Sequence, residues 1–195
     1  MMMKRILLLI ASLAALVPAS AQYAFNGELL DRLAEAYRKG DSRAVKAVEG
    51  VAAEADSTLL GMEPLTVTAK KQLPPSGDRR DYLSLSPYWW PDPSKPDGLP
   101  YIRRDGERNP EVYDCPEREN GDRLGTVTRT LAVLYRVTGD ERYAAKCAQL
   151  LRTWFLDPKL GMNPNMTYAQ LIRGRQTIRG TGIIDARRMA FALNA

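Results

Sequence analysis

Histidine is absent from this chain of 195 residues. Its absence excludes Ser-His-Asp and Cys-His nucleophilic sites, because both use an imidazole as the general base. The only two cysteines, Cys115 and Cys147, are too few to build a metal site without histidine. The sequence also contains no glycine-rich phosphate loop and no dinucleotide fingerprint. We therefore expect neither a metal nor a cofactor.

Long apolar runs are also scarce, and the one near the N-terminus is too short to span a membrane. Lys4 and Arg5 precede an apolar run over residues 6–17, and small residues follow at 19–21. This order is typical of a signal peptide, whereas a membrane-spanning helix needs about 20 apolar residues. We expect residues 1–21 to be removed, which leaves a periplasmic or secreted protein with no membrane attachment.

The chain is basic, with a formal net charge of +5. A basic protein can bind nucleic acid, a membrane surface or an acidic polymer, although a solvated surface explains the charge equally well. Export favours an acidic polymer over nucleic acid. An oxidising compartment also permits a bridge between Cys115 and Cys147. The alternative is a pair of free thiols, since Cys147 falls on the apolar face of an expected helix.

Apolar residues recur at helical spacing in three parts of the chain. Residues 26–60 and 123–157 each predict two helices joined by a turn, with Gly40 and Gly139 as helix-ending signals. A further helix is expected over residues 183–193. Helical pairs of this kind need neighbours to bury their apolar faces, which favours an all-α fold of packed helical hairpins.

Two irregular stretches separate these helices, and the first is rich in aromatic residues. Residues 64–120 contain the run Pro-Tyr-Trp-Trp-Pro at 87–91. Rigid aromatic surfaces suit stacking against sugar rings, and arginine suits carboxylates because its planar fork binds them with two hydrogen bonds. Side chains of adjacent residues in an extended strand point in opposite directions. We therefore expect one tryptophan to be buried and the other to face a groove.

The second irregular stretch, residues 159–182, carries amides and a phenol that can bind sugar hydroxyls or only satisfy loop backbone. Paired carboxylates for glycoside hydrolysis are a further possibility, although no spacing singles out a pair. The candidates are Asp97, Asp105, Glu107, Asp114 and Asp185.

Several blocks of sequence resemble the alginate-lyase family of polysaccharide lyases over about residues 60–188. The blocks are Ser-Gly-Asp at 76–78, Ser-Pro-Tyr-Trp-Trp-Pro-Asp-Pro at 86–93, Lys-Pro-Asp-Gly-Leu-Pro-Tyr-Ile-Arg-Arg-Asp-Gly at 95–106, Asn-Pro-Glu at 109–111, Leu-Arg-Thr-Trp-Phe-Leu-Asp-Pro at 151–158, Met-Asn-Pro-Asn at 162–165 and Gly-Thr-Gly-Ile-Ile-Asp at 180–185.

This resemblance implies an (α/α) toroid that cleaves a uronic-acid polymer, alginate or a glucuronan, by β-elimination without a metal. Family members use an Asn-His pair and a Tyr, with an Arg nearby. We expect these residues downstream of Ala195, so residues 22–195 would be the N-terminal part of a truncated, incomplete toroid. The anionic polysaccharide would then contact a groove on this chain. We expect the groove to contain Lys70, Tyr88, Trp89, Trp90, Arg103, Asn163, Asn165 and Tyr168.

Two alternatives to a lyase remain open from the sequence. One is an (α/α)-barrel glycoside hydrolase, and the other is a non-catalytic module that binds acidic polysaccharide. The aromatic run alone would be sufficient for such a module.

Overall fold

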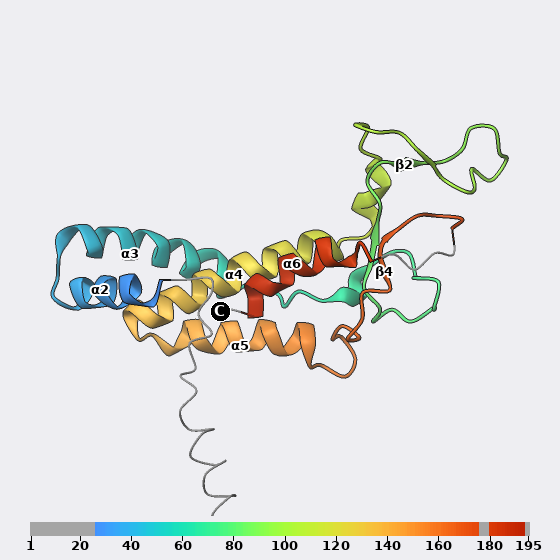
Figure 1. The fold of residues 1–195 in the computed structure, drawn as a ribbon. Helices are drawn as coiled ribbons and strands as arrows, with labels where there is room; N and C mark the ends of the chain where they lie inside the picture. Colours follow the sequence, from blue (N-terminus) through green and yellow to red (C-terminus); the bar gives the residue numbers. More distant parts are fainter. Residues whose placement is uncertain (1–25, 176–179, 194–195) are drawn as a thin grey trace, which may run out of the picture.

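A computed structural model describes residues 26–175 and 180–193 of the chain (Figure 1). The expected signal peptide lies outside these residues. The helices are α2 (Gly27–Arg38), α3 (Ser42–Glu54), α4 (Glu117–Thr138), α5 (Glu141–Phe155) and α6 (Gly182–Leu193). A π-helical turn at Ala55–Leu59 extends α3, and 3-10 turns occur at Val67–Ala69 and Pro110–Asp114.

The ends of the helices follow the capping signals in the sequence. Asn26, Asp41 and Asp140 each accept a hydrogen bond from a backbone N–H in the first turn of α2, α3 and α5. Gly139 ends α4 with a φ of 75°, a left-handed conformation that favours glycine. The predicted helical hairpins, α2–α3 and α4–α5, are therefore confirmed.

Helix α4 is the centre of the fold, and it packs against α2, α3, α5 and α6. Its residues Leu124 and Leu131 meet Leu150 and Trp154 of α5 in the main core, and all four are completely buried. The described helices form no closed ring, and α6 leaves Ile183 and Leu193 largely exposed (Figure 1). The all-α prediction is confirmed. Among the described residues, none of the helices has the length and apolar character needed to cross a membrane.

Four short strands lie in the stretches predicted as irregular. Strand β1 (Leu83–Leu85) pairs in parallel with β4 (Tyr168–Leu171), and β2 (Trp89–Trp90) pairs antiparallel with β3 (Ile102–Arg103). The first pair ties the two irregular stretches together at one end of the helices, away from the α2–α3 turn (Figure 1). Strands of two to four residues are too short to show an alternating pattern in the sequence.

Candidate functional site

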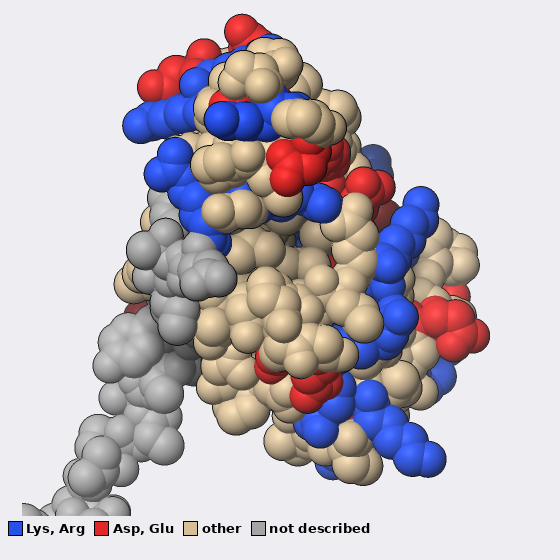
Figure 2. All heavy atoms as spheres, turned by 90° about the vertical axis from the view of Figure 1, so that its right-hand side faces the viewer, with Lys and Arg blue, Asp and Glu red and all other residues tan. Residues whose placement is uncertain are grey.

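A cavity of about 360 Å³ lies where the strands meet the first turns of α4 and α6. This volume is within the range of small-ligand sites. Among the residues that the structure describes, its lining includes two arginines and no carboxylate side chain. Figure 2 faces this end of the molecule, where basic side chains, with acidic ones among them, lie above, to the right of and below a surface of uncharged residues. The cavity is lined by Ser86, Pro87, Tyr88, Trp89, Arg103, Arg118, Gln170, Thr181 and Ile184.

The β1–β4 pair fixes the back of the cavity. The Ser86 hydroxyl donates a 2.7 Å hydrogen bond to the Gln170 carbonyl, and the Gln170 amide N–H donates a 2.8 Å bond to the Ser84 hydroxyl. Gln170 has a φ of 56°, which is uncommon for a residue other than glycine. Such conformations persist where surrounding contacts enforce them, often at binding sites. Here two serine hydroxyls hold the Gln170 backbone.

The two adjacent tryptophans lie at the outer side of the site, and both are half-buried rather than one being in the core. Trp89 pairs with Arg103 and lines the cavity, and the Arg175 guanidinium lies 4.5 Å from the centre of its ring. The Trp90 indole N–H instead donates a 2.9 Å bond to the Glu107 carbonyl. Only Trp89 thus contributes to the cavity, next to the exposed ring of Tyr88.

Asp185 lies beneath the cavity and is completely buried. Its carboxylate accepts hydrogen bonds from the Ser84 hydroxyl at 2.5 Å, the Gln170 side-chain amide at 2.8 Å and the Tyr82 hydroxyl at 3.2 Å. Burial and the neighbouring Asp185 charge raise the pKa of Tyr82, so this phenol remains a donor. The network joins β1, β4 and α6, and a fourth element, α4, approaches it through Arg118.

Arg118 is held more loosely than the other groups around Asp185. Its Nε lies 3.9 Å from Asp185 Oδ1, and its side chain is 17% exposed. Among the described residues, no hydrogen-bond partner reaches Arg118 Nη1 or the buried Thr181 hydroxyl. Both atoms are buried from solvent, so the part of Arg118 that is open to the cavity is the 17% of its side chain that remains exposed.

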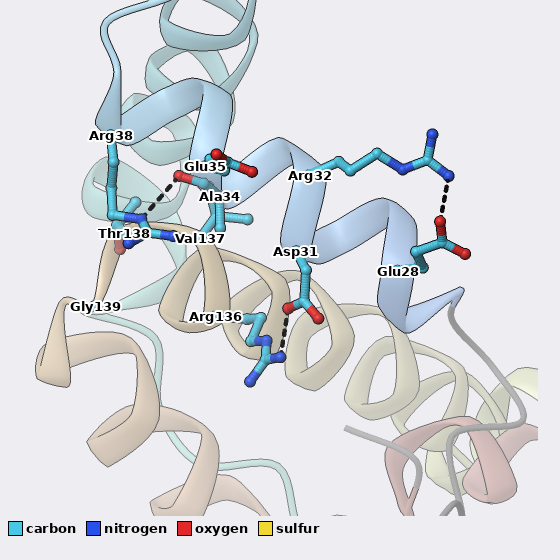
Figure 3. A pocket seen from close by; sticks show the side chains of 10 residues that line it. All are labelled: Glu28, Asp31, Arg32, Ala34, Glu35, Arg38, Arg136, Val137, Thr138 and Gly139. Atoms are coloured by element: carbon cyan, nitrogen blue, oxygen red, sulfur yellow. Dashed lines mark hydrogen bonds and ion pairs between the residues drawn. The ribbon is translucent and has the colours of Figure 1, made fainter.

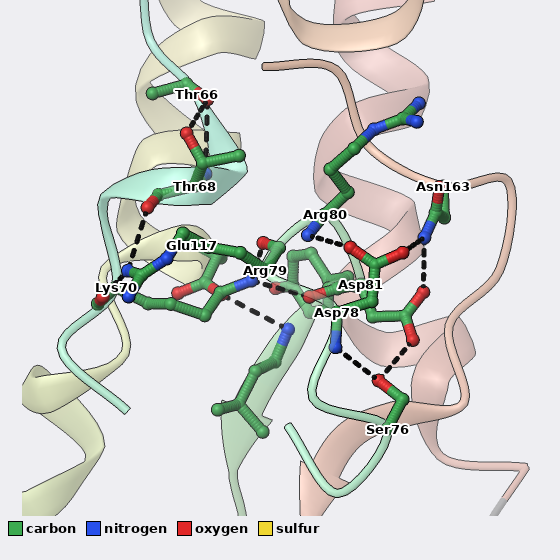
Figure 4. Close-up of polar contacts among 12 residues, drawn as sticks. Thr66, Thr68, Lys70, Ser76, Asp78, Arg79, Arg80, Asp81, Glu117 and Asn163 are labelled. Atoms are coloured by element: carbon green, nitrogen blue, oxygen red, sulfur yellow. Dashed lines mark hydrogen bonds and ion pairs between the residues drawn. The ribbon is translucent and has the colours of Figure 1, made fainter. Parts of the chain in front are cut away.

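Lys70, expected in the groove, is instead buried in a separate polar cluster (Figure 4). Its ammonium lies 2.8 Å from Glu117 Oε1, and both side chains are fully inaccessible to solvent. It also donates to the carbonyls of Arg79 at 2.8 Å and Asp81 at 2.5 Å. An ammonium group has three donors, and these three contacts occupy them. Lys70 therefore ties the segment before β1 to α4.

The expected amide group also lies apart from the cavity. The side-chain amides of Asn163 and Asn165 donate to Asp81 Oδ1 at 2.7 and 3.1 Å, and that of Asn163 also reaches Asp78 (Figure 4). Tyr168 packs on a small second core around Leu83. These contacts hold loops together, one of the two possibilities that the sequence left open for the amides.

The structure thus brings Tyr88, Trp89 and Arg103 together and places Trp90 beside them. Sequence reasoning missed Arg118 and Thr181 as lining residues. Arg118 follows Glu117 in a polar turn that resembles a solvated surface, so its position gives no periodic signal. None of the five carboxylates considered for hydrolysis lines the cavity.

A second cavity, of about 540 Å³, lies between α2 and the end of α4 (Figure 3). Its charged groups neutralise one another, since Arg32 pairs with Glu28 at 2.9 Å and Arg136 pairs with Asp31. No aromatic side chain lines it among the residues that the structure describes. We therefore place the candidate site in the cavity beside Trp89.

Both cysteines are buried free thiols. Cys115 lies in the small second core and Cys147 in the main core, so no bridge joins them. Burial raises the pKa of Cys115 to about 12 and also raises the pKa of Cys147, which keeps both thiols protonated. In the part of the chain that the structure describes, no cluster of Cys, Asp or Glu side chains is suited to hold a metal ion.

Comparisons with known proteins agree on one family. The family model described as alginate lyase matches residues 66–195. The crystal structure of an alginate lyase from Bacteroides ovatus is 40% identical in sequence, with a TM-score of 0.76, over 91% of this chain and 46% of that one. The chain thus spans less than half the length of that protein. No curated protein matches the chain.

Proposed function

Because the chain belongs to the alginate lyase family, we propose that it forms the substrate-binding part of a polysaccharide lyase. The substrate would be a uronic-acid polymer, alginate or a glucuronan, cleaved by β-elimination. The observation that carries this proposal is the cavity beside Trp89, whose described lining residues combine an aromatic wall with two arginines and no carboxylate. A chain of negatively charged sugars requires that combination.

Elimination needs three groups around one uronate. One neutralises the sugar carboxylate, a base takes the proton from C5, and an acid gives a proton to the oxygen that leaves C4. The electrons of the C5–H bond form a C4–C5 double bond as the C4–O bond breaks, so no water enters the products. The family's Asn-His pair cannot be placed here, because the chain has no histidine. We therefore assign proton transfer to another part of a longer polypeptide.

The N-terminal sequence supports export of this protein. A basic pair, an apolar run and small residues at 19–21 are the parts of a signal peptide. We propose a periplasmic or secreted location, where the polymer is accessible. N-terminal sequencing of the protein from a periplasmic or culture fraction should begin at Gln22, and a chain retaining Met1 in the cytoplasm would contradict export.

A binding module without catalysis is the second candidate function. The aromatic and basic lining residues of the cavity all belong to this chain, which is the part of the site that such a module would need. Such a module would bind the polymer and leave its length unchanged. The glycoside hydrolase alternative has less support, because no carboxylate side chain of the described part of the chain lines the cavity.

The test is an ultraviolet assay on alginate and glucuronan, which detects the conjugated double bond formed by elimination. The 195-residue chain is compared with a polypeptide extended through the downstream reading frame. Absorbance that appears only with the extended form would support the lyase proposal. It would also support the assignment of the catalytic groups to the extended part of the polypeptide. Binding without cleavage by both forms favours the module, and new reducing ends without absorbance would indicate a hydrolase.

A further inference from the structure

We propose that Arg118 binds the carboxylate of one uronate unit in the cavity beside Trp89, and that Asp185 holds the Arg118 side chain in position. This inference rests on the proposed function and adds to it a named residue for recognition of acidic sugars. Neither the family match nor the cavity alone identifies that residue.

Arg118 faces the Asp185 carboxylate on one side and the cavity on the other. It is the second residue of α4, its side chain lines the cavity, and 17% of that side chain is exposed. Asp185, from the first turn of α6, is completely buried. The guanidinium therefore lies between a buried carboxylate and the cavity.

Asp185 leaves much of the hydrogen-bonding capacity of Arg118 unused. The 3.9 Å separation of Arg118 Nε from Asp185 Oδ1 is an ion pair without a hydrogen bond. The Asp185 carboxylate already accepts three bonds from Ser84, Tyr82 and Gln170. A guanidinium offers five donors in one plane, and a carboxylate accepts two of them side by side. Arg118 can therefore take a second carboxylate from the cavity side.

The other arginine of the lining is more fully paired. Arg103 Nε and Nη2 both contact Asp105 Oδ1, at 2.9 and 2.8 Å, and the Arg103 side chain is 63% exposed. Asp105 thus holds the Arg103 guanidinium, and solvent screens its charge. Of the two arginines in the described lining, Arg118 is the one without a hydrogen bond to a carboxylate.

Trp89 and Thr181 complete the binding site for one sugar. The Trp89 ring can stack on the apolar face of a pyranose, and the buried Thr181 hydroxyl has no partner among the described residues. A site whose buried polar groups are satisfied only by the ligand discriminates strongly against an analogue lacking the matching group. Arg118 should therefore distinguish a uronate from the same sugar with its carboxylate reduced to an alcohol.

The test measures binding by calorimetry at fixed ionic strength, with the full chain and two ligands. One ligand is an oligouronate of defined length, and the other is the same oligosaccharide after reduction of its carboxylates. The variants are Arg118→Gln, Arg118→Lys and, as the matched control, Arg123→Gln. Arg123 lies on the same helix and is exposed.

Arg118→Gln should weaken binding of the oligouronate by at least about tenfold, because a hydrogen-bonded charge pair is lost, and leave the reduced ligand unchanged. Arg118→Lys should fall between Arg118→Gln and the unaltered chain, since it keeps the charge and loses the planar fork. Arg123→Gln should change neither affinity by more than about twofold.

Unchanged oligouronate affinity in Arg118→Gln would overturn the inference, as would equal loss of both ligands together with a lower melting temperature. If the unaltered chain binds neither ligand, the inference and the proposed substrate class both fail. If binding depends on Arg118 but the extended polypeptide forms no unsaturated product, only the lyase proposal fails.

Discussion

Two neighbouring residues at the start of α4 enter two different kinds of buried charge pair. Glu117 meets Lys70 at 2.8 Å with both side chains fully enclosed, whereas Arg118 lies 3.9 Å from Asp185 and borders the cavity. Lys70 also satisfies two backbone carbonyls, while Arg118 Nη1 has no hydrogen-bond partner among the described residues. One helical turn thus carries a closed pair beside an open one.

The difference between these two pairs distinguishes buried charges that stabilise the fold from a charge that is available to a ligand. Burial raises the pKa of Glu117, and the nearby Lys70 ammonium opposes this by favouring the ionised form. Such a pair resists any change to one partner, because the other is left charged and unsolvated. Arg118 is incompletely hydrogen-bonded among the described residues and borders a cavity. Replacing it should therefore reduce the free energy of unfolding less than replacing Lys70, and it should reduce ligand affinity more. Substitutions in the Lys70–Glu117 pair should therefore affect mainly stability, and substitutions of Arg118 should affect mainly ligand affinity.

The largest expected effect is on stability, from Lys70→Met. This change leaves Glu117 buried without its cation and should reduce the free energy of unfolding by about 3–5 kcal/mol. Urea unfolding followed by circular dichroism measures it. Adding Glu117→Gln removes the unpaired charge and keeps an acceptor for the Leu83 N–H, so the double variant should recover part of the loss. Strictly additive losses would show that the two groups do not interact.

Asp185→Asn should have an intermediate effect on stability. The amide keeps one acceptor oxygen for Ser84, Tyr82 or Gln170 but loses the charge that strengthens all three bonds. We expect a loss of about 1–3 kcal/mol by urea unfolding. Because Asp185 also positions Arg118, the oligouronate affinity should fall in the same variant. A loss of stability with unchanged affinity would mean that the hydrogen bonds of Asp185 stabilise the fold but do not position Arg118 for binding.

The helices could be predicted from sequence much better than the site. Periodic apolar residues and the turns at Gly40 and Gly139 predicted both hairpins, but α4 begins at Glu117, six residues before the helical periodicity that starts at Arg123. Glu117, in its first turn, is buried in a charge pair, and a buried charge looks like a surface residue in a sequence. Aromatic residues in a loop predicted Trp89. Arg118 could not be found, because Asp185 comes from a distant segment that only the fold brings close.

A smaller effect should distinguish the adjacent tryptophans. Trp89→Ala removes the wall of the cavity and should weaken oligouronate binding by about fivefold, equivalent to ~1 kcal/mol of aromatic contact. Trp90→Ala is the matched control, because its indole bonds to Glu107 outside the cavity lining. It should change affinity by less than about twofold. Equal losses in the two variants would mean that both rings only support the loop.

The smallest expected effect concerns Asp81 and depends on pH. Burial alone would raise the pKa of this carboxyl, but hydrogen bonds from Asn163, Ser76 and Asn165 outweigh burial and hold the pKa below its usual 3.8. As the pH falls, the unfolded chain therefore takes up this proton before the folded chain does. The stability that Asp81 contributes is present above pH 3.8 and is lost as the pH falls through the pKa of the folded state.

Asp81→Asn should accordingly cost about 1 kcal/mol of unfolding free energy at neutral pH, and the cost should shrink as the pH falls below 3.8. Urea midpoints of the variant and the unaltered chain at several pH values measure the difference. Other carboxyls titrate in both proteins, so their effects cancel in that difference. Glu63→Gln, at an exposed position, should show no such pH dependence. If the stability difference between Asp81→Asn and the unaltered chain stays constant in acid, the charge of Asp81 does not contribute to holding the two loops together.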